Sequence, residues 1–133
     1  MEIRSEKELI KYGKRLADDL KPPAALELVG DVGAGKTTLV RGIAEGLGVK
    51  ELVTSPSFTI SKRYPFAGGV LVHYDFYRLT DPGIMREEIA ETLNDPKAIV
   101  VIEWGESVTD LLPEKHTRIE IKLQDDNTRL IKQ

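Results

Sequence analysis

The stretch GDVGAGKTT at residues 30–38 constrains this chain more than any other feature. Its first eight residues match the phosphate-binding pattern G-x-x-x-x-G-K-[ST] at every fixed position. The apolar run ALELVG (25–30) leads into it and predicts a buried strand. Apolar residues then recur at helical spacing over 36–47, and Gly48 is a natural end for that helix. A strand, a glycine-rich turn and a helix in this order form a cradle for nucleotide phosphates.

Each residue type in this loop has a chemical role. Glycines allow successive backbone N–H groups to converge on phosphate oxygens, at the positive end of the helix dipole. The Lys36 ammonium would reach the β- and γ-phosphates, and the Thr37 hydroxyl can ligate Mg²⁺. The predicted phosphate-binding residues are Asp31, Val32, Gly33, Ala34, Gly35, Lys36, Thr37 and Thr38. The loop therefore predicts ATP and Mg²⁺ as the bound groups.

The rest of the chain alternates strand and helix signals. Ser5 and Glu8 fit a capping box at the start of a helix that Pro22 and Pro23 end. The other expected elements are a loop leading into a strand over 53–60, a strand over 68–79, a short helix over 82–95, a covered strand over 98–104, and two tail strands around a turn at 125–127. This order predicts one α/β domain over residues 1–133. We expect it to be P-loop NTPase-like, with a mixed, mostly parallel central sheet flanked by helices.

Composition excludes several classes of function. The chain has 133 residues, a formal net charge of −3 and no cysteine, so disulfides and cysteine-bound zinc are absent. Basic residues are dispersed, which argues against direct binding of nucleic acid. No apolar run reaches the roughly eighteen residues that a membrane span requires. Because the N-terminal segment is also too charged for a signal peptide, a cytoplasmic location is expected.

Two carboxylates are candidates to complete a Mg-nucleotide site. Glu103 follows the apolar run AIVVI, where an ionised carboxylate needs a cation; its alternative role is a strand-end acid that meets solvent. Asp75 would bind the metal or orient the attacking water, or would form an ion pair with Arg78. Strand alternation places His73, Asp75 and Tyr77 on one face, and we expect the histidine to be packed or hydrogen-bonded rather than catalytic.

Four sequence blocks, GDVGAGKTT, SPSFTI, HYDFYRL and IEWGE, stand here in order between residues 30 and 106. With this spacing the chain resembles the bacterial tRNA threonylcarbamoyladenosine biosynthesis ATPase family, TsaE (formerly YjeE). The resemblance implies a small P-loop ATPase with weak hydrolysis of its own. It also implies partners, the TsaD and TsaB proteins, whose complex modifies the adenosine beside the anticodon of ANN-reading tRNAs. Contact with tRNA would be indirect, through that complex.

The resemblance also assigns roles to single positions. Lys36 and Thr37 match the residues that hold the phosphates and Mg²⁺, Glu103 matches the metal-site glutamate, and Asp75 matches the acid of an H-x-D-x-Y-R block. Lys36, Asp75 and Glu103 are thus the predicted catalytic residues. Residues 54–58 lie on the family's switch-like segment.

Some features depart from the family pattern or leave alternatives open. The family commonly has Thr where this chain has Ser57, and the stretch 82–95 differs enough to carry no residue assignments. Adenine contacts near Ile3 and in the tail are a guess. A small-metabolite kinase on the same loop is the main alternative, although no Arg-rich lid segment is evident. A nucleotide-gated binding module with negligible catalysis is a third hypothesis.

Overall fold

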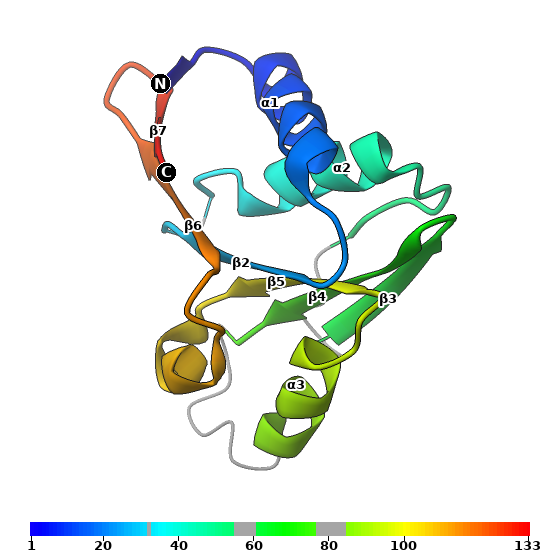
Figure 1. The fold of residues 1–133 in the computed structure, drawn as a ribbon. Coiled ribbons are helices and arrows are strands. Elements are labelled where there is room, and N and C mark those ends of the chain that lie inside the picture. Colours follow the sequence, from blue (N-terminus) through cyan, green and yellow to red (C-terminus); the bar gives the residue numbers. More distant parts are fainter. Residues whose placement is uncertain (32, 55–60, 77–84) are drawn as a thin grey trace.

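The chain folds around one seven-stranded sheet with helices on both faces (Figure 1). The structure is a computed structural model that describes residues 1–31, 33–54, 61–76 and 85–133, without the side chains of residues 105–107. The strands are β1 (Glu2–Ile3), β2 (Ala24–Val29), β3 (Ser61–Phe66), β4 (Gly69–Asp75), β5 (Ala98–Glu103), β6 (Thr117–Leu123) and β7 (Arg129–Lys132). The helices are α1 (Glu6–Asp19), α2 (Lys36–Leu47), α3 (Arg86–Leu93) and the 3₁₀ helix η2 (Gly105–Leu111).

The sheet is mixed, as the sequence predicts. Its strand order is β1-β7-β6-β2-β5-β4-β3. The four central strands, β6, β2, β5 and β4, run parallel, and the outer strands pair antiparallel with them or with each other. All six residues of β5 are buried, because helices cover both faces of this central strand. The predicted α/β fold with flanking helices is confirmed.

Helices α1 and α2 cover one face of the sheet. Ser5 caps α1 by accepting a hydrogen bond from the Glu8 backbone N–H at 3.1 Å. The Glu8 carboxylate in turn accepts from the backbone N–H of Arg4 at 2.9 Å, one residue earlier than in an ideal capping box. Helix α2 spans the predicted residues 36–47 and ends at Gly48, whose φ of 87° is left-handed. Both ends of α2 therefore follow directly from glycines in the sequence.

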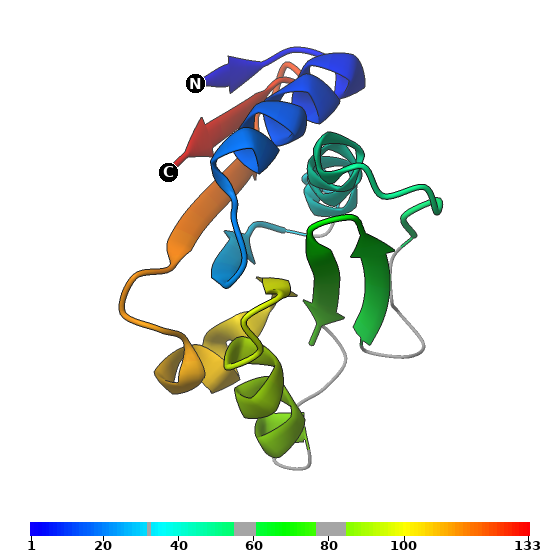
Figure 2. The ribbon, with the colours of Figure 1, turned by 45° about the vertical axis from the view of Figure 1, so that its right-hand side comes forward.

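The opposite face is covered by α3 and η2, as the two views of the ribbon show (Figures 1 and 2). Apolar side chains of β2, β4 and β5 alternate between the two layers: Leu26, Leu71 and Ile99 pack toward α1 and α2, and Ala25, Val72 and Val100 pack toward α3 and η2. The result is two hydrophobic clusters separated by the sheet.

Several elements differ from the expectation. Strand β3 lies between the predicted segments 53–60 and 68–79, where no element was expected; it is an edge strand, which accommodates Pro65. The predicted strand over 68–79 is described as β4, which ends at Asp75, and residues 77–84 lie outside the described part. Residues 53 and 54 are not in a strand, and 55–60 are not described. The short strand β1 had no sequence signal.

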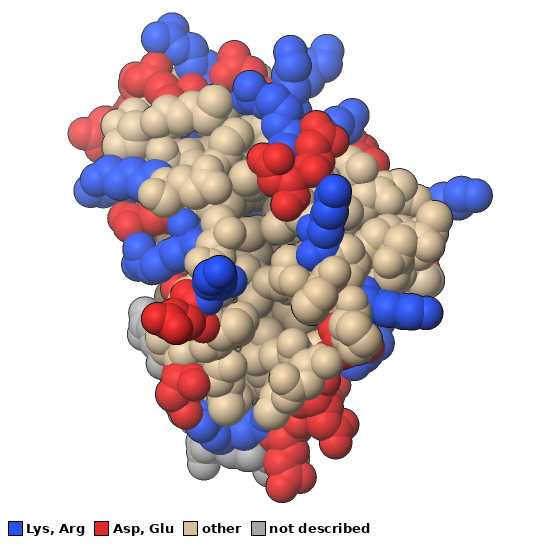
Figure 3. All heavy atoms as spheres, in the orientation of Figure 1, with Lys and Arg blue, Asp and Glu red and all other residues tan. Residues whose placement is uncertain are grey.

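The surface carries interspersed charges. On the face shown in Figure 3, Lys and Arg side chains are interspersed with Asp and Glu around a broad uncharged area, without a large area of one sign. None of the helices in the described ranges is long and apolar enough to cross a membrane.

Candidate nucleotide-binding site

The loop between β2 and α2 has the backbone of a phosphate cradle. Gly33 and Gly35 adopt φ values of 83° and 108°, which side-chain-bearing residues rarely reach. The Ala34 N–H donates to the Asp31 carbonyl at 3.0 Å and closes a tight turn. The N-cap residue of α2 is Gly35, which has no side chain to accept a hydrogen bond from the first backbone N–H groups of the helix. Val32, also predicted to bind phosphate, lies outside the described residues.

The loop is supported from the far end of the chain. Arg129, on β7, donates from Nε to the Ala34 carbonyl at 2.7 Å. A Cβ atom at position 35 would lie 2.8 Å from the Leu9 side chain and 3.1 Å from Arg129 Nε. Gly35 is therefore required by close packing as well as by its φ value. This role of Arg129 was not predicted, because Arg129 lies 95 positions away from Ala34 in the chain.

Lys36 begins α2 and is buried, with 6% of its surface exposed. Its ammonium donates to the backbone carbonyl of Gly30 and to that of Asp31 at 3.3 Å. It also lies 4.2 Å from the centroid of the Trp104 ring, a cation–π contact. Burial lowers the pKa of Lys36 below its ordinary value.

Two carboxylates act against this effect of burial. The negative charge of Glu103 raises the pKa of Lys36 the most. Asp75 raises it less, and Asp31 less again. Glu103 and Asp75 are register partners at the carboxyl ends of β5 and β4, and the backbone N–H of Phe76 donates to the Glu103 carbonyl at 3.1 Å. The strand ends thus bring both predicted acids to the side of the sheet that carries α2 and Lys36.

His73 is fully buried on β4 and its Nε2 contacts the Glu103 carboxylate oxygen Oε2. It lies two residues before Asp75, on the same face of the strand. The expectation that this histidine is packed or hydrogen-bonded is confirmed. The contact between His73 and Glu103 was not predicted, because the two residues lie on different strands and are 30 positions apart in the sequence.

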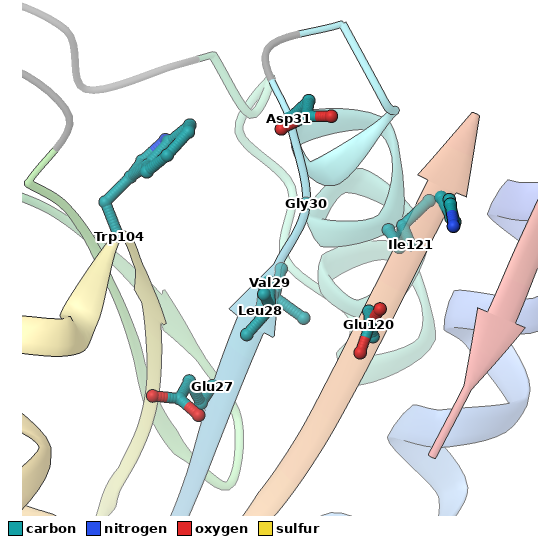
Figure 4. A pocket seen from close by; sticks show the side chains of 9 residues that line it. Glu27, Leu28, Val29, Gly30, Asp31, Trp104, Glu120 and Ile121 are labelled. Carbon is teal, nitrogen blue, oxygen red and sulfur yellow. The ribbon is translucent and has the colours of Figure 1, made fainter.

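Trp104 follows β5 and precedes η2 in a left-handed conformation, with φ of 58° and ψ of 41°. This region is unusual for a bulky residue, and such backbone strain is typical of functional sites. The ring forms one side of a pocket of about 250 Å³, and the Glu120 side chain on β6 lies at the other (Figure 4). Gly30 and Asp31 also line this pocket, but Lys36, Glu103 and Asp75 do not. The pocket adjoins the phosphate loop without being the candidate phosphate site.

The start of the predicted switch-like segment is anchored to neighbouring elements. Arg41 of α2 donates to the Val53 carbonyl at 3.1 Å. Thr54 Oγ1 accepts from Lys62 Nζ at 2.9 Å, and the Thr54 carbonyl accepts from the Tyr64 hydroxyl at 3.3 Å. The remaining residues of the segment, 55–58, and the proposed ion-pair partner Arg78 lie outside the described residues.

The structure therefore gathers most of the predicted site. Asp31 and residues 33–38 form the described loop and the first turn of α2, and Lys36 lies close to the side chain of Trp104. Thr37 is the second residue of α2, half-buried. Glu103 and Asp75 reach the same edge from neighbouring strands. A loop of this kind beside two carboxylates is chemically suited to a nucleotide with its divalent cation.

Comparison with known proteins gives a consistent result. Residues 3–131 match the family model described as threonylcarbamoyl adenosine biosynthesis protein TsaE. The chain is 41% identical over 113 residues to a protein of Streptomyces coelicolor named tRNA threonylcarbamoyladenosine biosynthesis protein TsaE, covering 84% of this chain and 76% of the relative. A protein of the same name from Haemophilus influenzae is 36% identical over 138 residues, covering 98% and 87%.

A solved structure supports the same grouping. The crystal structure of YdiB from Bacillus subtilis superposes with a TM-score of 0.82 at 33% sequence identity, covering 98% of this chain and 80% of that one. The similarity thus extends over nearly the whole chain, in sequence and in fold.

Proposed function

This chain belongs to the TsaE family of tRNA threonylcarbamoyladenosine biosynthesis proteins, and on that premise we propose that it binds Mg-ATP and hydrolyses it slowly. Hydrolysis would support a cytoplasmic TsaD–TsaB threonylcarbamoyl-transferase complex, which modifies the adenosine beside the anticodon of ANN-decoding tRNAs. The observation that carries the proposal is the buried Lys36 at the end of a glycine-rich loop, where the negative charges of Glu103 and Asp75 act to raise its pKa. The protein would meet tRNA only through the complex.

The loop residues would hold the phosphates of ATP. Backbone N–H groups and the α2 dipole favour negative charge at this end of the helix, and the Lys36 ammonium adds a full positive charge. The Lys36 ammonium donates to two backbone carbonyls and lies over the Trp104 ring. Phosphate oxygens are stronger partners for an ammonium than neutral carbonyls, so ATP would draw Lys36 away from these contacts. The residues proposed to bind ATP are Asp31, Val32, Gly33, Ala34, Gly35, Lys36, Thr37 and Thr38.

Thr37 and Glu103 would hold Mg²⁺ together with the phosphates. In the part of the chain that the structure describes, no three His, Cys, Asp or Glu side chains cluster closely enough to bind a metal ion by themselves. Mg²⁺ usually takes one or two protein ligands and completes its shell with water and phosphate oxygens, so one hydroxyl and one carboxylate fit this ion. When bound, the ion would neutralise charge on the phosphates.

Asp75 is the residue we propose to orient the attacking water. It is adjacent to Glu103 in register, on the side of the sheet that faces the loop. In hydrolysis the bond from the γ-phosphorus to its bridging oxygen breaks, and a bond to the water oxygen forms. Lys36 would offset the negative charge that develops on the phosphoryl oxygens.

Reconstitution tests this function. The protein is mixed with purified TsaD and TsaB, unmodified tRNA, a threonylcarbamoyl donor and Mg-ATP, and modified nucleoside is counted over several turnovers. We expect ATP-dependent multiple turnover with this chain and not with Lys36→Ala, which should also lose ATP binding by calorimetry. Lys97→Ala removes the same charge at an exposed position before β5, and should behave like the original protein.

The other outcomes identify the alternatives. Tight ATP binding by Lys36→Ala would contradict the phosphate-loop assignment. Transfer of phosphate to a small acceptor would favour a kinase. Binding of ATP without any hydrolysis, alone or with partners, would favour a nucleotide-gated binding module.

A further inference from the structure

The His73 imidazole is a fully buried titratable side chain beside the candidate site. It has no exposed surface and lies on the central strand β4, opposite Val101 of β5 and Lys62 of β3. It faces the layer formed by α1 and α2, as Glu103 does. Its Nε2 contacts Glu103 Oε2, and the Glu103 residue is itself 2% exposed. The contact is therefore shielded from solvent.

The two ring nitrogens of His73 have different surroundings. Nε2 faces the carboxylate, whereas Nδ1 is buried and has no hydrogen-bond partner among the described residues. A hydrogen on Nδ1 would be a buried donor without an acceptor, which folded proteins rarely contain. The hydrogen is best placed on Nε2, where an ionised carboxylate accepts it. His73 then has a single N–H, and Glu103 receives it.

This hydrogen bond restricts Glu103 in a specific way. A glutamate side chain rotates about three bonds, and its final torsion is broad and weakly restricted by itself. Donation from His73 to Oε2 fixes that rotation and leaves Oε1 to act as a ligand. Hydrogen bonds from a second layer of residues commonly orient the carboxylates that bind metal ions in this manner.

We propose that His73 is a positioning residue, which orients the Glu103 carboxylate for Mg²⁺ by donating a hydrogen bond from Nε2 to Oε2. The proposal rests on the proposed function, because it requires a Mg-nucleotide at this site. It is distinct from a purely structural role, in which the buried pair would stabilise the core without affecting the metal. A positioning role predicts a specific loss of metal affinity, while nucleotide binding without metal is retained.

The test measures binding rather than turnover. The affinity for a non-hydrolysable ATP analogue, adenylyl imidodiphosphate, is determined by calorimetry in EDTA and at increasing free Mg²⁺. Mg²⁺ should raise the affinity for the analogue above its value in EDTA. For His73→Leu, we expect the Mg²⁺ concentration that produces half of this increase to be about 10-fold higher or more. The affinity in EDTA should stay within about twofold. His73→Gln places an amide N–H near the position of Nε2 and should recover most of the loss.

Tyr74→Phe is the matched control. Tyr74 is the next residue of β4, is equally buried and bonds Thr92 Oγ1 at 2.9 Å on the opposite face of the sheet. Its substitution also removes one buried hydrogen bond and should lower the thermal unfolding temperature without shifting the Mg²⁺ dependence. If His73→Leu does not fold, His73→Met replaces it, because an unbranched side chain adapts to irregular space.

A double substitution tests whether His73 acts through Glu103. In a Glu103→Gln background, His73→Leu should add no further shift in the Mg²⁺ dependence. An unshifted His73→Leu, or an equal shift in both backgrounds, would overturn the positioning role and leave the proposed function intact. If the original protein binds the analogue equally in EDTA and in Mg²⁺, the Mg-nucleotide assignment fails and the positioning role fails with it.

Discussion

At the scale of single residues, Lys36 links the candidate function to the stability of the fold. Burial lowers its pKa, and below that lowered pKa the residue is protonated in both the folded and unfolded states. As pH rises from the lowered value toward the ordinary 10.5, the unfolded chain binds a proton that the folded chain does not. The free energy of unfolding therefore increases with pH through this window because of Lys36.

Lys36→Met isolates this contribution. We expect the difference in unfolding free energy, original protein minus Lys36→Met, to grow between pH 7.5 and pH 10 in urea titrations. Taking the difference cancels other groups, such as Tyr12 and Tyr74, whose pKa values burial raises and which titrate in the same range. A difference that is constant or falls with pH would show that burial does not destabilise the charged lysine.

Residues of the site were predictable where they are close in sequence. Lys36, Thr37 and the loop glycines form one uninterrupted motif, and the apolar run before Glu103 marks it as a strand-end acid. The contact of His73 with Glu103 depends on β4 and β5 being neighbours, and nothing in either segment specifies which strands pair. Arg129 was not predicted for the same reason. Local patterns identify the groups, and the strand order decides which groups meet.

At the scale of elements, α1 and α2 approach closely because glycine stands at their contact. A Cβ atom built on Gly42 would lie 2.4 Å from the Ile10 backbone oxygen, too close for any side chain. Gly→Ala within a helix normally stabilises by about 1 kcal/mol, since alanine has the higher helix propensity. At Gly42 we expect the opposite sign, a destabilisation of about 1–3 kcal/mol, as overpacking typically produces.

Urea unfolding of Gly42→Ala measures this effect. Glu45→Ala is a suitable control, because Glu45 lies on the same helix and is exposed, and its carboxylate forms a surface ion pair with Lys14 at 3.2 Å. Its unfolding free energy should change by less than about 0.5 kcal/mol. An increase in stability for Gly42→Ala would show that the helices separate readily and that their close approach is not required.

Elements with a strong local signal agree best with the sequence prediction. Helix α2 lies between two glycines with positive φ, so its bounds follow from backbone stereochemistry. Strand β3 contains Pro65, which disfavours a strand, and it is stabilised by pairing with β4. The sequence of residues 61–66 does not indicate this pairing. Strand β1 has two residues and exists only through its pairing with β7. Tertiary pairing, rather than propensity, determines these two strands.

At the scale of the whole molecule, both chain ends support the phosphate loop. The N-terminal amine donates to the Ile131 carbonyl at 3.1 Å, and the Ile131 N–H donates to the Met1 carbonyl at 2.8 Å, which brings the termini together (Figure 1). From the β7 strand fixed in this way, Arg129 reaches the Ala34 carbonyl. The loop thus receives a hydrogen bond from outside the β2–α2 unit that forms it, and we expect its backbone order to depend on the tail hairpin.

Arg129→Ala should therefore loosen the loop without unfolding the protein. Loss of one hydrogen bond worth about 1 kcal/mol predicts roughly fivefold faster amide exchange in a peptide covering residues 30–37. Hydrogen–deuterium exchange with mass spectrometry measures this rate. Arg118→Ala is the control, since Arg118 lies on β6 and its described ion pairs are with Glu27 and Glu120 rather than with the loop. If exchange in this peptide is equal in the two variants, the loop is ordered by its own glycines and helix α2, and the tail hairpin contributes only to the edge of the sheet.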